Sequence, residues 1–304
     1  MTEQPTGWRA TGLYWTGGIP GFGLADQAGS EREQPAHPGA TLSYGLAGER
    51  RCIGIWQAAD RRRRCCPFSQ PLPAQASSAQ CAACAAVDPG RAFSRSSTPD
   101  DDRTYRLYLA WFGVGLLKVG LTATARDTDR LAEQGAIAFT WLGHGRLQAV
   151  RAAERAVAAS GLAPDRRQRR TKIAAWWSLP VADERRRDLE AAHRAIHTAV
   201  SWPAGLTLAP AAVVDRVAVF GLDRVPVSCQ EVIGLHLGSV INGTVRCVAG
   251  RDLILDTVHG PVLLDARLLA GWAVHPTDAV IGGLDLRSCH HVRRDDAAEQ
   301  HVLF

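Results

Sequence analysis

The sequence predicts an α+β protein whose central part runs hairpin, helix, strand, helix. Residues 106–112 alternate in polarity and are rich in aromatic and aliphatic side chains, as strands are. The glycines of 113–115 form a short turn, and 116–121 repeats the strand pattern, so the two segments form a β-hairpin. The following segments change to helical spacing, which places α and β elements in one module.

The elements behind the hairpin follow from capping and stop signals. Thr122 or Thr124 can cap a helix over 125–134, which Gly135 ends. Residues 137–142 read as a third strand, and a second helix follows over 147–160.

The flanks of this module are predicted to be rich in β-structure. Strands are expected at 8–15 and 41–46, and a helix at 183–200. The predicted division is a β-rich N-terminal segment over 1–104, a central domain with a helical extension over 105–200, and a small β-rich domain over 201–304. Short strands are expected in the last part at 216–220, 238–248, 253–257 and 261–264.

Composition limits the classes of function. The 304 residues carry a formal net charge of +5, which permits nucleic-acid binding without requiring it. No run of eighteen apolar residues and no signal-peptide pattern is visible, so we expect a cytoplasmic protein without membrane partners. Lys118 and Lys172 are the only lysines, which makes each a candidate for a specific role.

Five of the eight cysteines lie within a few dozen residues and predict a structural zinc site. Cys81 and Cys84 form a C-x-x-C knuckle that can supply two thiolates to one tetrahedral metal. Cys52 and one of the adjacent pair Cys65 and Cys66 complete the set. We prefer Cys66, because the proline behind it shapes a knuckle-like turn, although adjacent cysteines are hard to separate by sequence.

Two other interpretations of the cysteines stay open, unliganded thiols and a redox C-x-x-C. A thioredoxin-like motif needs a strand before it and a helix behind it, and neither is evident here. With four thiolates as ligands, a zinc site would be closed and structural.

Glu154 is singled out by its place on the second helix of the module. It shares a helix face with Leu147, Val150 and Val157, which is otherwise apolar. A carboxylate on such a face is costly to desolvate unless it binds a metal or pairs with an arginine, and both alternatives stay open.

The densest basic segment is a candidate for phosphate contacts. Positive side chains here could bind a nucleic-acid backbone, and a solvated loop is the alternative. The residues concerned are Arg166, Arg167, Arg169, Arg170 and Lys172.

The central module resembles the GIY-YIG nuclease superfamily, and with the cysteines ahead of it an uncharacterised bacterial family of GIY-YIG-like proteins. Residues 106–108 look like the first motif and 118–120 like the second, while Arg130 resembles the helix arginine and Glu154 the metal-binding glutamate. The resemblance implies a metal-dependent nucleic-acid phosphodiesterase, with Tyr108, Lys118, Arg130 and Glu154 as catalytic residues and Mg²⁺ or Mn²⁺ on Glu154.

The motifs depart from that family at three positions. Arg106 replaces the first glycine, Lys118 replaces the second-motif tyrosine, and Gln134 stands where many members have a histidine. Lys118 could clamp a phosphate or, with a lowered pKa, act as a base. Two other functions therefore stay open: a zinc-containing nucleic-acid-binding protein that does not cleave, and an enzyme acting on a small biosynthetic intermediate.

Overall fold

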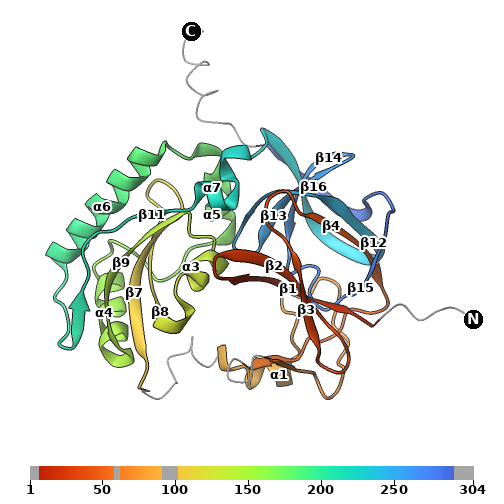
Figure 1. Ribbon diagram of the computed structural model, residues 1–304, viewed down its shortest axis with the longest axis horizontal. Coiled ribbons are helices and arrows are strands. Elements are labelled where there is room, and N and C mark those ends of the chain that lie inside the picture. Colours follow the sequence, from red (N-terminus) through yellow and green to blue (C-terminus); the bar gives the residue numbers. More distant parts are fainter. Residues whose placement is uncertain (1–6, 58–61, 91–101, 291–304) are drawn as a thin grey trace, which may run out of the picture. The chain divides into compact units, whose positions relative to one another are not determined.

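The computed structural model describes residues 7–57, 62–90 and 102–290 and divides the chain into two compact units. Unit 1 comprises residues 1–98 and 228–289, and unit 2 comprises 99–227 and 290–304. Both contain β-sheet, and helices are few in the first, so the predicted mixture of α and β structure is confirmed (Figure 1).

Unit 1 is built on a nine-stranded sheet to which both ends of the chain contribute. The strand order is β13-β14-β12-β4-β15-β1-β2-β3, with β16 also paired to β12. The elements in this unit are β1 Arg9–Thr16, β2 Ile19–Ala25, β3 Glu31–Pro35, β4 Thr41–Ala47, β5 Ile55–Gln57, β6 Arg62–Arg64, α1 Ala82–Ala86, β12 Ser228–Ala249, β13 Asp252–Thr257, β14 Gly260–Asp265, β15 Ala273–Pro276 and β16 Gly282–His290.

Long-range pairings hold this sheet together. Strand β4 pairs with β12, with Tyr44 opposite Ile241, and β1 meets β15 at Arg9 and Ala273. The segments 1–104 and 201–304, expected as separate parts, therefore contribute strands to one sheet. The glycine-rich segment behind β1 is a tight turn at Gly17–Gly18 between two hairpin strands.

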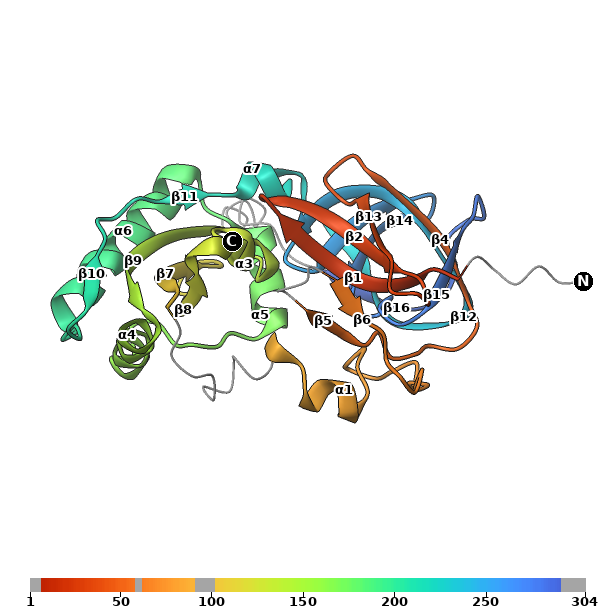
Figure 2. The same ribbon diagram turned by 60° about the horizontal axis from the view of Figure 1, so that its bottom comes forward.

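Unit 2 is a five-stranded sheet with helices packed on it (Figure 2). The strand order is β10-β9-β7-β8, and β11 pairs with β9. Its elements are β7 Thr104–Trp111, β8 Leu117–Ala123, η1 Thr124–Arg126, α3 Asp129–Glu133, β9 Ala138–Arg146, α4 Leu147–Ala159, α5 Arg169–Ala174, η2 Ala175–Ser178, α6 Ala182–Ala199, β10 Leu206–Leu208, β11 Val214–Asp215, α7 Val217–Phe220 and η3 Leu222–Arg224.

The order hairpin, helix, strand, helix is present as predicted, with three differences. Neither Thr122 in β8 nor Thr124 in η1 caps the helix, because the N-cap residue of α3 is Thr128. The helix expected over 125–134 is split, because Asp127 takes a positive φ of 38° that interrupts the helical path between η1 and α3. The strand expected at 216–220 is wrong, since Val217–Phe220 forms α7. A short apolar run cannot be assigned to helix or strand from periodicity alone.

Alternate residues of β7 face opposite sides of the sheet. Tyr108, Ala110 and Phe112 pack with Leu131 of α3 in one buried cluster. On the other side, the indole N–H of Trp111 donates to Asp188 of α6 at 3.2 Å. The hairpin is therefore fixed on both faces, which gives the polar groups along β8 a rigid support. No helix in the described part of the chain is long and apolar enough to cross a membrane.

Candidate functional site

A four-cysteine cluster in unit 1 has the geometry of a metal centre. The sulfur atoms of Cys52, Cys66, Cys81 and Cys84 all lie within 4.8 Å of one another. The Cys66 and Cys81 sulfurs are 3.9 Å apart, and a tetrahedron with Zn–S bonds of about 2.3 Å has edges of about 3.8 Å. The donor set and spacing fit a closed structural zinc site.

Backbone N–H groups surround these sulfurs as they do in metal knuckles. Gly54 and Cys81 donate their N–H groups to the Cys52 sulfur at 3.4 and 3.2 Å. Burial raises the pKa of the Cys66 thiol, but two backbone donors, together with hydrogen bonds to Cys52 and Cys84, outweigh burial and lower that pKa to about 7. These donors belong to Gln70 and Phe68. Burial raises the pKa values of the Cys52 and Cys84 thiols, so zinc, which binds thiolates, would displace their protons.

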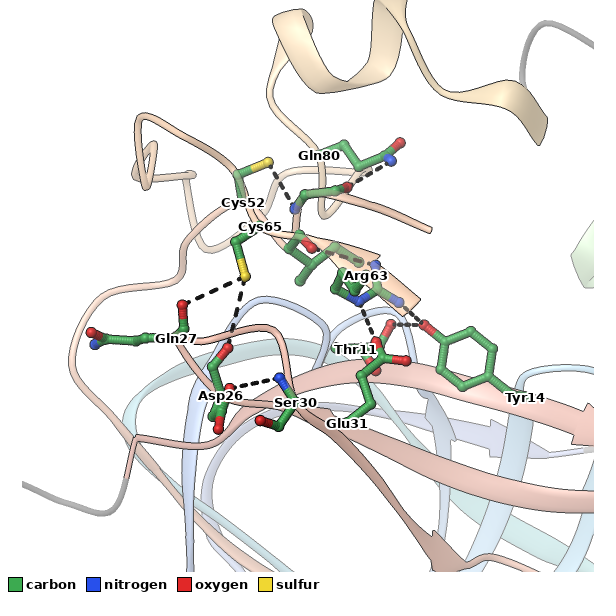
Figure 3. Close-up of polar contacts among 12 residues, drawn as sticks. Thr11, Tyr14, Asp26, Gln27, Ser30, Glu31, Cys52, Arg63, Cys65 and Gln80 are labelled. Atoms are coloured by element: carbon green, nitrogen blue, oxygen red, sulfur yellow. Dashed lines mark hydrogen bonds and ion pairs between the residues drawn. The ribbon is translucent and has the colours of Figure 1, made fainter. Parts of the chain in front are cut away.

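Cys65 lies outside the cluster, which resolves the choice between the adjacent cysteines. Its thiol is directed at the carbonyl oxygens of Asp26 and Gln27, at 3.9 and 3.7 Å (Figure 3). Consecutive residues of an extended segment point in opposite directions, so only one of the pair can face the cluster. The cluster therefore contains Cys66, the preferred member of the pair.

In unit 2, four side chains singled out by the sequence lie near one another although they come from four elements. The Lys118 ammonium of β8 is 3.4 Å from the Tyr108 hydroxyl of β7. Arg130 of α3 and Glu154 of α4 both act electrostatically on Lys118 and on Tyr108. The module therefore collects a phenol, an amine, a guanidinium and a carboxyl group in one region.

Burial is the main influence on the pKa values in this region. The pKa of Lys118 is lowered to about 8, mainly by burial; the charge of Glu154 opposes this shift and that of Arg130 adds to it. Burial raises the pKa of Tyr108 to about 12, although Arg130 and a hydrogen bond from Gln134 act against this. At neutral pH, Tyr108 keeps its proton and Lys118 can lose one.

Glu154 is held in a mixed environment. Burial raises the pKa of its carboxyl group, the charge of Lys118 lowers it, and Asp165 raises it. The stripe expected on α4 is present, since Leu147, Val150 and Val157 are buried. Asp165 lies in the loop that follows α4. It belongs to no recognisable sequence motif, and it was therefore not predicted as a site residue.

Two further residues position the Tyr108 hydroxyl. The Gln134 side-chain amide donates to it at 2.7 Å, at the position where the sequence departs from the GIY-YIG pattern. Gly120 pairs with Tyr108 across the hairpin, and a Cβ atom there would lie 2.2 Å from the hydroxyl oxygen. Glycine at this position is therefore needed to leave room for the phenol.

The basic segment is packed against the same region. Arg167 donates to the carbonyl oxygen of Leu117 at 2.7 Å, and Lys172 donates to that of Gln134 at 2.7 Å. The Lys172 ammonium also lies 4.6 Å from the Phe112 ring centroid. Arg166 and Arg170 are exposed, and Arg169 is half-buried. Arg167 and Lys172 therefore anchor the segment, and the exposed arginines extend beside it.

Together, the fold and the two clusters define a mixed α/β protein with a candidate metal centre and a second polar cluster on a hairpin. The chain belongs to the family described as "Protein of unknown function (DUF2797)", whose model matches residues 39–274. That range includes both clusters. No match was found among curated proteins or among solved structures.

The lowered pKa of Lys118 predicts a gain in stability when this lysine is replaced. The folded pKa of about 8 is below the ordinary lysine value of 10.5, so the unfolded state binds more protons between these values and stability rises with pH across that window. Below about pH 8 the full penalty of holding the charged lysine applies. Lys118→Met should therefore raise the free energy of unfolding by about 1–3 kcal/mol at pH 6.5.

Urea unfolding at pH 6.5 and 9.5 measures this effect, with Lys172→Met as the matched control. Lys172→Met loses the bond to Gln134 and should destabilise at both pH values. An equal or lower stability of Lys118→Met at pH 6.5 would contradict the burial of this charge.

Proposed function

We propose that the protein is a GIY-YIG-like phosphodiesterase that acts on nucleic acid and depends on a divalent metal. The observation that carries the proposal is the proximity of Tyr108, Lys118, Arg130 and Glu154 on the hairpin and its two helices. The exposed arginines of the segment 166–170 supply positive charge for a phosphate backbone next to this region.

Lys118 acts as the base in this proposal. With a pKa of about 8, its amine is partly neutral near physiological pH and accepts a proton from water. The water oxygen then forms the new bond to phosphorus, the P–O ester bond breaks, and the leaving oxygen takes a proton from solvent. Tyr108, with a pKa of about 12, stays protonated and orients the water through its hydroxyl.

Arg130 braces the phosphate. Its side chain is 44% exposed and bonds Glu133 at 3.4 Å, so it can turn to an incoming phosphate at small cost. A planar guanidinium suits the equatorial oxygens, which gain negative charge in the transition state.

Glu154 and Asp165 fit a hard divalent cation. When both carboxyl groups are charged they repel each other, and for this reason Asp165 raises the pKa of Glu154. A bound cation would relieve this repulsion. One or two carboxylates, with water and substrate oxygens, are the usual ligands of Mg²⁺. When bound, the cation would supply charge stabilisation to the phosphate oxygens.

A cleavage assay on end-labelled single-stranded and duplex oligonucleotides tests the proposal. We expect products only with Mg²⁺ or Mn²⁺, and a rate that rises with pH and levels off above about 8, because Lys118 must be neutral. Lys118→Met should lower the rate by about 10²–10⁴-fold. Arg194→Met, which changes an exposed residue of α6, is the control.

Two outcomes would rule out the proposal that the protein is a hydrolase. Salt-sensitive binding without cleavage in either metal would leave a nucleic-acid-binding protein. Absence of binding even at low salt would turn attention to a small-molecule substrate.

A further inference from the structure

Unit 1 contains a cavity of about 360 Å³ that the proposed function does not use. Its walls are the segment 11–14 of β1, the loop 77–80, Ile53 and two arginines, Arg251 and Arg267. Among the described residues that line the cavity, these arginines are the only charged ones. Its volume is in the lower part of the range of small-molecule sites, which is about 300–1,000 Å³.

Both arginines on the cavity wall pair with the same carboxylate. The carboxylate of Asp265, only 4% exposed, accepts from both Arg251 at 3.2 Å and Arg267 at 2.6 Å. Arg50 lies close behind and is 2% exposed, and burial and the charge of Arg267 lower its pKa. Asp252 lies opposite Asp265 in the β13–β14 register. Two guanidinium groups on the cavity wall therefore share the single carboxylate of Asp265, and this arrangement favours an anion.

The loop that forms one wall is held in place by Arg50. Its guanidinium donates to the carbonyl oxygens of Ala74 and Ala76, each at 2.8 Å, and to that of Ala270 at 2.9 Å. These bonds fix the loop before any ligand arrives, which lowers the entropy cost of binding.

The wall formed by the segment 11–14 and Ile53 is fixed by polar contacts that Figure 3 shows. The Tyr14 hydroxyl donates to the Thr11 carbonyl at 2.9 Å, and Arg63 donates to that hydroxyl at 2.8 Å. Arg63 also donates to the Ile53 carbonyl at 3.3 Å and pairs with Glu31 at 2.7 Å. This arginine is paired with its own carboxylate.

The cysteine centre adjoins both walls. Ile53 follows Cys52, and Gln80, whose side-chain amide donates to the Gly54 carbonyl at 3.0 Å, precedes Cys81. A metal on the cysteines would therefore hold the cavity open in the shape described.

We propose that this cavity binds a small phosphomonoester. Two guanidinium groups and the hydroxyls of Ser77 and Ser78 can bond the three terminal oxygens of one phosphate, which carboxylates, with two oxygens, cannot match. The apolar remainder of the ligand would lie against Leu13 and Ile53. The site lies wholly in unit 1 and is independent of the function proposed for unit 2.

Calorimetric titration of the full chain with adenosine monophosphate, inorganic phosphate and adenosine tests this proposal. We expect adenosine monophosphate to bind most tightly, inorganic phosphate more weakly, and adenosine without measurable heat. Arg267→Gln should weaken binding of adenosine monophosphate at least tenfold. Arg251 keeps Asp265 paired in that variant, so the fold should survive, and Arg251→Gln is the reciprocal variant.

Arg64→Gln, an exposed arginine of the same unit, is the control and should bind as the parent does. Equal affinity for adenosine and its monophosphate, equal affinity of both arginine variants and the parent, or no binding of either phosphate at millimolar concentration would each overturn the proposal.

Discussion

The double variant Cys81→Ser/Cys84→Ser should lose its zinc, whereas the parent should carry about one zinc ion per chain. The variant keeps two of four thiolates, and a closed tetrahedral site needs all of them. Structural zinc contributes about 10–16 kcal/mol in small zinc domains, which is comparable to the whole stability of a typical domain. The segments 50–57 and 62–88 should therefore unfold locally, and their amide protons should exchange rapidly.

Metal analysis and hydrogen exchange measure these effects, and the chain offers a close control. Cys65→Ser changes a thiol directly beside a cluster residue but directed at two carbonyl oxygens, so this variant should keep its zinc. Cys66→Ser should lose it. Full retention of zinc in the double variant would refute the metal centre.

Glu154→Gln should show whether Glu154 is a metal ligand of a catalytic site or a partner in a structural ion pair. Burial raises the pKa of Glu154, so the folded state disfavours its charged form above the unfolded pKa. Glutamine keeps the size and removes that cost, and the metal-free variant should melt at or above the temperature of the parent. Mg²⁺ should raise the melting temperature of the parent and leave that of the variant unchanged.

The alternative predicts the opposite result. If Glu154 serves as the structural partner of Lys118 or Arg151, the same change leaves a buried cation without its carboxylate and should cost about 3–5 kcal/mol. Arg194→Gln on an exposed face of α6 is the control for non-specific effects.

Local elements of this protein could be predicted from the sequence because their signals are local. The hairpin is marked by alternation around a glycine turn, and α4 by a stripe that begins at Leu147. The cysteine spacing indicated Cys52, Cys81 and Cys84 as candidate ligands, whereas the choice between Cys65 and Cys66 required their side-chain directions. The separations of Cys65 and Cys66 from each other cysteine differ by only one position, so spacing cannot show which of the two is the ligand.

Long-range features could not be predicted. The pairing of β4 with β12 joins residues about two hundred positions apart, and no local pattern encodes it. For the same reason Asp165 and the cavity beside Arg251 were invisible, since their partners are close only in the folded chain. The sequence could mark Lys118 as unusual, but its lowered pKa depends on burial that only packing creates.

The rate of oligonucleotide cleavage by the parent and by Glu154→Gln, measured side by side in Mn²⁺ at pH 8.5, tests the central claim most directly. At this pH most of Lys118 is neutral, so the base is available in both proteins. The account predicts cleavage by the parent and a rate at least about 100-fold lower for the variant, because the proposed metal ligand is gone. Equal rates in the two proteins, or no cleavage by the parent, would contradict it.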